Sequence, residues 1–466
     1  MKRGRSTLIL LVLAAALGGY IWFVERESPT SDDEPKAERV FAGLEQDAIE
    51  SLTMQSGTGE VTSLKKSGAG WTITAPIEVP ADASEVSGVT SNLATLDITR
   101  VVDEKPASLQ AFGLETPRLK VTFASKGTTR TLLIGEKTAT GGDVYAKLGD
   151  APRVFLMPGW LEQSFDRTTF QLRNKAIVTV DRDAIDRVAI IGAPGTIELR
   201  KDGDAWRLVQ PLSARADSAE VGTLLTRISS GQMQAIVAEQ PATLDTYGLQ
   251  PARTTVTATG GGQTLAQLLV GGPSGEAVHM KDAARPMVFT VEKALADDLQ
   301  RGADAYRSKD VFAFRLFNLS RLVVTRGTTA RTFEKKKTSD AKDATETWTQ
   351  TSPADASVKA SAIEDIASRL STLRVESWTQ APAGATPVMT VQAQFDGTTQ
   401  ERVQIVQAGD QMLAIRDGEP GAAQLTAAAV TDVIGLLDAP AEPAAAPTGT
   451  PAASPTGTPA TPGAKQ

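Results

Sequence analysis

Three short stretches decide the fold of this chain: residues 71–76 read WTITAP, residues 206–211 read WRLVQP and residues 348–353 read WTQTSP. The tryptophans lie 135 and then 142 residues apart, and matching sequence surrounds each of them. Solenoid units mostly run about 20 to 50 residues, so repeats of this length are whole domains. Proline cannot donate to a sheet ladder, and it should therefore end each tryptophan strand. The sequence predicts one module present three times, with the anchor residues Trp71 and Pro76, Trp206 and Pro211, and Trp348 and Pro353.

A helix is predicted after each tryptophan strand, because apolar residues recur there on a 3.6-residue period. Such a stripe indicates a helix that packs on a sheet. Ser84 and Ser218 stand near the first two helix starts, and we expect them to be the N-caps. The apolar stripes are Val86, Val89, Leu93 and Leu96, then Val221, Leu224, Leu225 and Ile228, and finally Ile363, Ile366, Leu370 and Leu373.

An aromatic-Gly-Leu turn marks the first two copies, and the third copy lacks it. A proline follows each of these turns, which suits a helix end that passes into a strand. A terminal repeat often diverges, because one of its faces has no neighbouring unit. The two turns are Phe112-Gly113-Leu114 and Tyr247-Gly248-Leu249.

The fold class expected from these patterns is α+β. We predict an N-terminal transmembrane helix followed by three tandem modules, each a mainly antiparallel sheet with one principal packed helix. The predicted domains are a cytoplasmic tip and anchor (1–24), a polar linker (25–40), module one (41–176), module two (177–312), a diverged module three (313–438) and a disordered Ala/Pro/Thr tail (439–466).

The N-terminal segment from Ser6 to Val24 carries no charge over nineteen residues. A helix of that length spans roughly 28 Å, close to the thickness of the bilayer's hydrocarbon core. Basic residues precede it and acidic residues follow it, which predicts a single-pass bacterial inner-membrane protein with a cytoplasmic N-terminus and a periplasmic body. The alternative is a cleaved signal peptide with Leu8 to Ala16 as its apolar core.

Composition excludes several function classes. The chain has 466 residues, no cysteine and a net charge of −7. Without cysteine there can be no disulfide, no thiolate chemistry and no cysteine-ligated zinc. An acidic chain without a clustered basic face argues against binding to nucleic acid.

Candidate residues for chemistry each have a simpler structural interpretation. His279, the only histidine, lies in an apparent strand and has no recognisable nucleophile motif beside it. Asp82 and Asp217 recur in register, but the calcium-loop pattern is missing, so helix capping or solvation is favoured. Gly260-Gly261-Gly262 lacks the Lys-Ser/Thr of a phosphate loop and is interpreted as a hairpin turn. Lys335-Lys336-Lys337 is interpreted as a solvated loop.

The three tryptophans could form a platform for a glycan or a lipid. Their recurrence at one position of each module favours core anchors instead, with an internal partner for each indole N–H. The sequence therefore predicts no catalytic residue, no metal ligand and no cofactor.

The anchor ending in Gly-Tyr-Ile-Trp-Phe-Val, the Trp-x-[Ile/Leu]-x-x-Pro strand and the Phe/Tyr-Gly-Leu turn resemble the DUF4340 family. The resemblance covers most of residues 6–438 and is strongest in the first two copies. It implies a bacterial, membrane-anchored protein of unassigned biochemistry. Family members are often encoded beside ABC-transporter components of the gliding-motility type, which implies an extracytoplasmic accessory role.

Three function hypotheses follow from the sequence and the resemblance. The first is a non-enzymatic accessory subunit or scaffold with a protein partner in the envelope, and it predicts exposed apolar or aromatic residues. The second is a periplasmic glycan- or lipid-binding protein, and it predicts a deep apolar pocket in at least two modules. The third is an envelope hydrolase, which needs a cleft that gathers acids around His279 or a serine.

Overall fold

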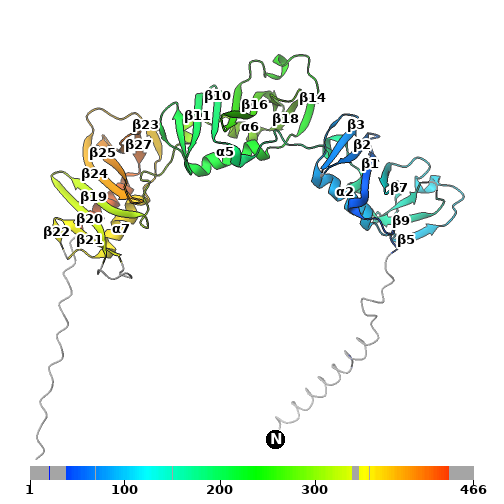
Figure 1. The fold of residues 1–466 in the computed structure, drawn as a ribbon, viewed down its shortest axis with the longest axis horizontal. Coiled ribbons are helices and arrows are strands. Elements are labelled where there is room, and N and C mark those ends of the chain that lie inside the picture. Colours follow the sequence, from blue (N-terminus) through cyan, green and yellow to red (C-terminus); the bar gives the residue numbers. More distant parts are fainter. Residues whose placement is uncertain are drawn as a thin grey trace, which may run out of the picture. The chain divides into compact units, whose positions relative to one another are not determined.

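The computed structural model describes residue 20 and residues 38–68, 70–149, 151–337, 346–355 and 357–439 (Figure 1). The predicted anchor, apart from Tyr20, and most of the predicted linker and tail lie outside these residues. Within the described ranges, no helix is long and apolar enough to cross a membrane. By contact density the chain divides into two compact units, one ending at Lys175 and one beginning at Ala176.

The three modules share one topology. Each contains a nine-stranded antiparallel sheet, and the first has the order β4-β3-β2-β1-β6-β7-β8-β9-β5. The sheets of the second and third modules repeat this order strand for strand. The prediction of three α+β modules, each with a mainly antiparallel sheet, is confirmed, and the balance is strongly towards β.

Module one forms the first compact unit together with its entering chain. Glu38 and Val40 already pair with the segment after the helix, through the bonds Ile98 N to Glu38 O (2.8 Å) and Val40 N to Leu96 O (2.9 Å). Its elements are β1 (Ile49–Gln55), β2 (Val61–Ser67), β3 (Gly70–Ala75), β4 (Val79–Pro80), α2 (Ala83–Thr95), β5 (Arg100–Asp103), β6 (Leu119–Ser125), β7 (Thr128–Lys137), β8 (Asp143–Leu148), β9 (Val154–Pro158), α3 (Glu162–Phe165) and α4 (Thr169–Leu172).

Module two shows the alternation that builds these sheets. Along β15, buried side chains alternate with half-buried ones at every position, as a strand with one core-facing side requires. Its elements are β10 (Arg187–Gly192), β11 (Gly195–Asp202), β12 (Ala205–Gln210), β13 (Ala214–Arg215), α5 (Ser218–Ser230), β14 (Ala235–Ala238), β15 (Thr254–Gly260), β16 (Gln263–Ser274), β17 (Ala277–Asp282), β18 (Val288–Glu292) and α6 (Lys293–Asp298).

Module three keeps the sheet and adds a longer final helix, α8. Residues 335–337 belong to strand β20, so their prediction as a loop is wrong. Lys335 lies with its ammonium group 5.5 Å from the centre of the Trp348 ring, and the pairing with β21 extends to Lys337. The elements are β19 (Leu319–Arg326), β20 (Thr329–Lys337), β21 (Glu346–Ser352), β22 (Ala354–Asp355), α7 (Ala360–Ser371), β23 (Ser377–Thr379), β24 (Thr386–Phe395), β25 (Thr399–Ala408), β26 (Gln411–Arg416), β27 (Ala422–Leu425) and α8 (Ala427–Asp438).

The principal helices α2, α5 and α7 bury their apolar stripes in the module cores. Val86, Val89 and Leu93 of α2 are at most 1% exposed, and the matching residues of α5 and α7 are also buried. The first two helices are capped by Asp82 and Asp217, whose carboxylates accept from two main-chain N–H groups each at 3.0 and 3.2 Å. The predicted serine N-caps, Ser84 and Ser218, are therefore wrong, since both lie within the first turn.

Candidate functional site

The anchor tryptophans lie in β3, β12 and β21, and each anchor proline directly follows the last residue of its strand, so the anchors belong to the framework of each module. Trp206 and Trp348 are buried at 8% and 3% exposure, whereas Trp71 is only partly buried against the core. The peptide bond before each anchor proline is cis: Ala75–Pro76, Gln210–Pro211 and Ser352–Pro353.

Each aromatic-Gly-Leu turn packs against a glycine in the sheet of its own module, Gly135 in β7 or Gly271 in β16. Gly113 and Gly248 take φ values of 64° and 65°, a left-handed conformation that favours glycine. The carbonyl oxygen of Phe112 lies so close to Gly135 that a Cβ there would be 2.1 Å from it. In module two, a Cβ added at Gly271 would lie 2.4 Å from the carbonyl oxygen of Tyr247. Leu114 and Leu249, which complete the turns, are buried at 2% and 3% exposure.

His279 belongs to this packing. Its ring lies 5.2 Å from the Tyr247 ring in an edge-on contact, and Phe112 and Tyr145 make the matching contact at 5.1 Å in module one. The Nδ1 atom of His279 is buried and has no hydrogen-bond partner in the described part of the chain. Within that same part, no group of three or more His, Asp or Glu side chains is placed to hold a metal ion.

The module entries are where charged side chains gather. In module two, Arg285 donates to the main-chain carbonyls of Ala176 (3.1 Å) and Ile177. In module three, Arg416 donates to the carbonyl of Val311 at 3.2 Å, which is the matching position. Both arginines belong to the last hairpin of their module: Arg285 lies between β17 and β18, and Arg416 is the last residue of β26, before β27.

Module one holds its entering chain from the same hairpin by a different atom pair. Arg153, between β8 and β9, makes two hydrogen bonds with the Glu38 carboxylate at 2.7 and 2.8 Å. These bonds lower the pKa of Glu38 and raise that of Arg153. In each module an arginine thus binds the segment of chain that enters the module. We call Arg153, Arg285 and Arg416 the entry arginines.

The entry arginine of module three is part of a buried charge network. The Glu401 side chain is 2% exposed, forms an ion pair with Arg416, and accepts from the main-chain N–H groups of Ala313 and Phe314 at 3.0 and 3.1 Å. Burial lowers the pKa of Arg416, while Glu401 and Glu419 oppose that shift. The pairing matters because an isolated buried charge is costly.

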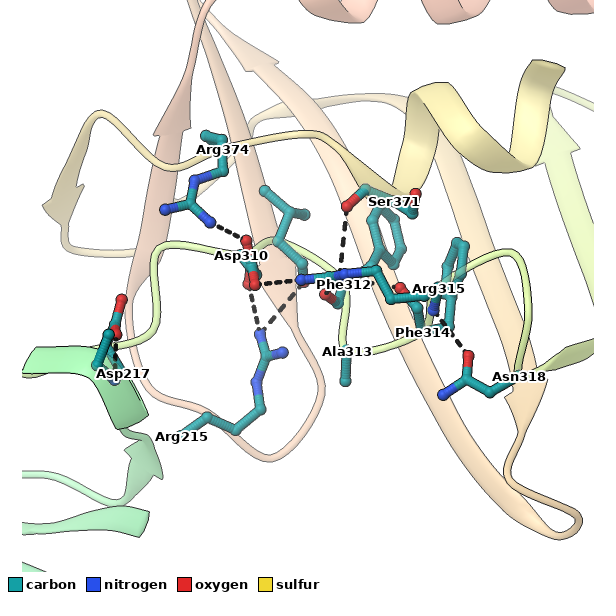
Figure 2. Close-up of polar contacts among 12 residues, drawn as sticks. Arg215, Asp217, Asp310, Phe312, Ala313, Phe314, Arg315, Asn318, Ser371 and Arg374 are labelled. Atoms are coloured by element: carbon teal, nitrogen blue, oxygen red, sulfur yellow. Dashed lines mark hydrogen bonds and ion pairs between the residues drawn. The ribbon is translucent and has the colours of Figure 1, made fainter. Parts of the chain in front are cut away.

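The second unit also contains a junction between modules two and three. Arg215, from β13 of module two, donates to the Glu419 carboxylate at 2.9 Å and to the main-chain carbonyl of Asp310 at 2.8 Å. The carboxylate of Asp310 pairs with Arg315 and Arg374 (Figure 2). Glu419 is shared with Arg416 at 3.3 Å, so the junction and the entry of module three form one network.

Arg307 adds a stacked contact to the same junction. Its guanidinium lies 3.4 Å from the centre of the Trp378 ring, and its Nη2 donates to the carbonyl of Pro420 at 3.3 Å. The residue is 3% exposed, and burial lowers its pKa. A cation on an indole face is worth about 2 kcal/mol when it is desolvated. This contact therefore contributes to holding the two modules together.

The sequence did not reveal the entry arginines or the junction. A usable signal was present, because Pro152, Pro286 and Pro420 recur in the three hairpins, beside the entry arginines in modules one and two. The arginines themselves do not align, and each contacts residues about 100 positions away, so their partners cannot be read from local patterns.

The fold and the module entries define a class of protein. It is a tandem array of α+β modules in which charged side chains bind the segment of chain that enters each module. A family model described as "Domain of unknown function (DUF4340)" matches residues 71–205 and 206–391. The chain belongs to the DUF4340 family, as the resemblance predicted. No curated protein and no solved structure matches the chain.

The matched family units are out of phase with the structural modules. They begin at Trp71 and Trp206, on strands β3 and β12, and each ends inside the next module. The first matched segment, residues 71–205, therefore contains the entry of module two. The second matched segment, residues 206–391, contains the junction at Arg307 and Asp310. A unit of the family sequence thus includes the segment that leads from one module to the next.

Proposed function

We propose that the chain is a non-enzymatic, membrane-anchored extracytoplasmic scaffold or accessory subunit. The segment from Ser6 to Val24 is its anchor in the inner membrane, and the modules lie in the periplasm. Its partner is a protein of the envelope, and the family resemblance favours an assembly that contains an ABC transporter.

One observation carries this proposal: the charged side chains at the entries of modules two and three are used on the chain itself. Arg285 and Arg416 bind entering main chain, and Glu401 is occupied by two N–H groups and a guanidinium. Groups used in this way fix the path of the chain at the entries of modules two and three. That is the requirement of a scaffold, whereas a catalytic acid or base must remain open to a substrate.

Exposed aromatic side chains supply candidate contacts for a protein partner. Trp160 in the first unit is 72% exposed, and Phe317 in the second is 82% exposed. Aromatic residues are enriched among the side chains that dominate protein interfaces. We assign partner contacts to these two positions.

The proposal is tested by purifying the full chain, with its anchor, from crosslinked native membranes. An affinity tag inserted after Gly327, in the β19–β20 turn, leaves both chain ends unchanged. The expected result is co-purification of specific envelope subunits, reduced when Phe317 and Trp160 are both changed to serine. The matched control changes Ile191 and Val237, two apolar residues that are 55% and 42% exposed, and should leave recovery unchanged.

Recovery of the chain alone from crosslinked membranes would overturn the accessory-subunit proposal. If the aromatic variant and the control variant lose the partner equally, Phe317 and Trp160 are not specific partner contacts.

A further inference from the structure

Module three carries an open polar groove of about 470 Å³ on its sheet. The groove crosses strands β19, β24 and β25 and reaches the end of β26. Its lining includes Arg321, Val323, Gln392, Gln394, Gln400 and Arg402. These side chains, all polar except Val323, take no part in the junction described above.

Strand register sets the groove side chains in two rows. Gln394 on β24 lies opposite Arg321 on β19 and Gln400 on β25. One step along, Gln392 lies opposite Val323 and Arg402. The arginines are thus two strands apart and offset by two residues along the strands, a separation of roughly 12 Å between their backbones at the usual strand geometry. The groove floor is a row of amides between two guanidinium groups.

The other two modules close the same register positions with contacts of their own. In module one, Thr122 and Thr131 share a hydrogen bond of 3.0 Å. In module two, Gln267 donates to Thr257 at 3.4 Å. The corresponding pair in module three, Gln392 and Arg402, makes no such bond within the described residues. Its polar groups remain available to a ligand.

The charge of the groove favours a ligand with a carboxylate. Three arginines and two acids line it, and Arg416 and Glu401 form an ion pair with each other, which leaves Arg321, Arg402 and Asp417. Arg402 faces Asp417 at 3.9 Å, which is too long for a hydrogen bond. Arg321 pairs with Glu334 at 3.3 Å and is still 51% exposed at its side chain. The guanidinium fork matches a carboxylate in two-point geometry.

The amides distinguish an acidic glycan from an acidic peptide. A glutamine side chain offers both donors and an acceptor, which matches sugar hydroxyl groups that also do both. A dense run of carboxylates would meet Asp417 and Glu334 at the groove margin. Val323 supplies an apolar contact for the C–H face of a sugar ring. We propose that this groove binds a glycan that carries spaced carboxylates, with Arg321 and Arg402 on the carboxylates and the glutamines on the hydroxyls.

The test is a titration of the full chain, in detergent micelles and with labelled valine methyl groups, with trigalacturonic acid. Saturable shifts of the Val323 methyl signals are expected. Changing Arg402 to alanine should weaken binding about tenfold or more, since a hydrogen bond to a charged group is lost. Gln392→Ala should also weaken binding, and Arg402→Lys should fall between Arg402→Ala and the wild type. The matched control, Thr257→Ala with Gln267→Ala in module two, should bind normally.

Absence of saturable shifts at Val323 would overturn the proposal. Equal binding of uncharged cellotriose would show that the groove does not recognise the carboxylates. Equal binding of triglutamate would show that the ligand is an acidic peptide and not a glycan. The readout uses purified protein without a partner, so the proposal neither rests on the scaffold function nor fails with it.

Discussion

Arg215 and Glu419 are 204 positions apart in the sequence, and their guanidinium Nε and carboxylate Oε1 lie 2.9 Å apart. Their side chains are only 20% and 10% exposed, so this ion pair is screened less than a surface pair. It connects β13 of module two with the β26–β27 hairpin of module three. The junction is therefore a specific contact within the second unit.

Removal of Arg215 should loosen this junction. The variant Arg215→Ala is expected to cost about 1.5–3 kcal/mol of local stability, the range for a hydrogen bond to a charged group. Hydrogen–deuterium exchange should become faster around Val311, where the main chain is held. The exposed pair Lys293–Asp297, at 66% and 57% exposure, is the control, and Lys293→Ala should change little. Unchanged exchange in Arg215→Ala would show that the ion pair does not hold the modules.

Alanine should not be tolerated at the glycines under the aromatic-Gly-Leu turns. A Cβ at Gly135 or Gly271 would overlap a carbonyl oxygen of the turn, and such overpacking costs about 1–3 kcal/mol. Urea unfolding should shift to lower concentration for both variants. Gly142, where an added Cβ would meet open space, is the control, and Gly142→Ala should have little effect. Equal midpoints for all three variants would contradict the tight contact.

Substitution of the capping aspartates should lower stability more than substitution of the neighbouring serines. Asp82→Ala and Asp217→Ala are each expected to cost about 0.5–2 kcal/mol, because two N–H groups lose their acceptor. Ser84→Ala and Ser218→Ala should be nearly neutral. Thermal unfolding followed by circular dichroism compares the four variants, and a larger effect at the serines would restore them as caps.

Stability should fall at alkaline pH through Tyr306. Burial raises the pKa of this phenol to about 12, from an ordinary value of 10.0. The folded state holds the proton more tightly than the unfolded state. The stability that Tyr306 contributes through this proton is therefore fully present below about pH 10 and is lost as the pH rises towards 12. The free energy of unfolding measured across this range should decline less steeply in Tyr306→Phe. Identical slopes in the two proteins would contradict the assignment.

The repeated patterns made much of the fold predictable. The stripe of Ile363, Ile366 and Leu370 indicates a buried helix face, because helical spacing is a local property of the sequence. The choice between Asp82 and Ser84 as cap was harder, because both residue types cap helices and only the backbone conformation distinguishes them.

Contacts between distant residues could not be predicted in the same way. Arg153 and Glu38 are 115 positions apart, and nothing near either residue indicates the other. Three adjacent lysines are polar, and this local pattern favours a loop at Lys335. In the fold its ammonium group donates to the carbonyl of Leu316 while the strand continues beneath it. Long-range partners depend on sheet order, which local propensity does not fix.

The most direct test of the scaffold function places a photo-crosslinking residue at Phe317 or Trp160 in the full chain in native membranes. The account predicts a discrete adduct with an envelope protein at one or both positions, and no adduct at Asp410, an exposed polar residue in the β25–β26 turn. Adducts at neither aromatic position, or adducts only with lipid or glycan, would contradict a role as a protein-binding scaffold.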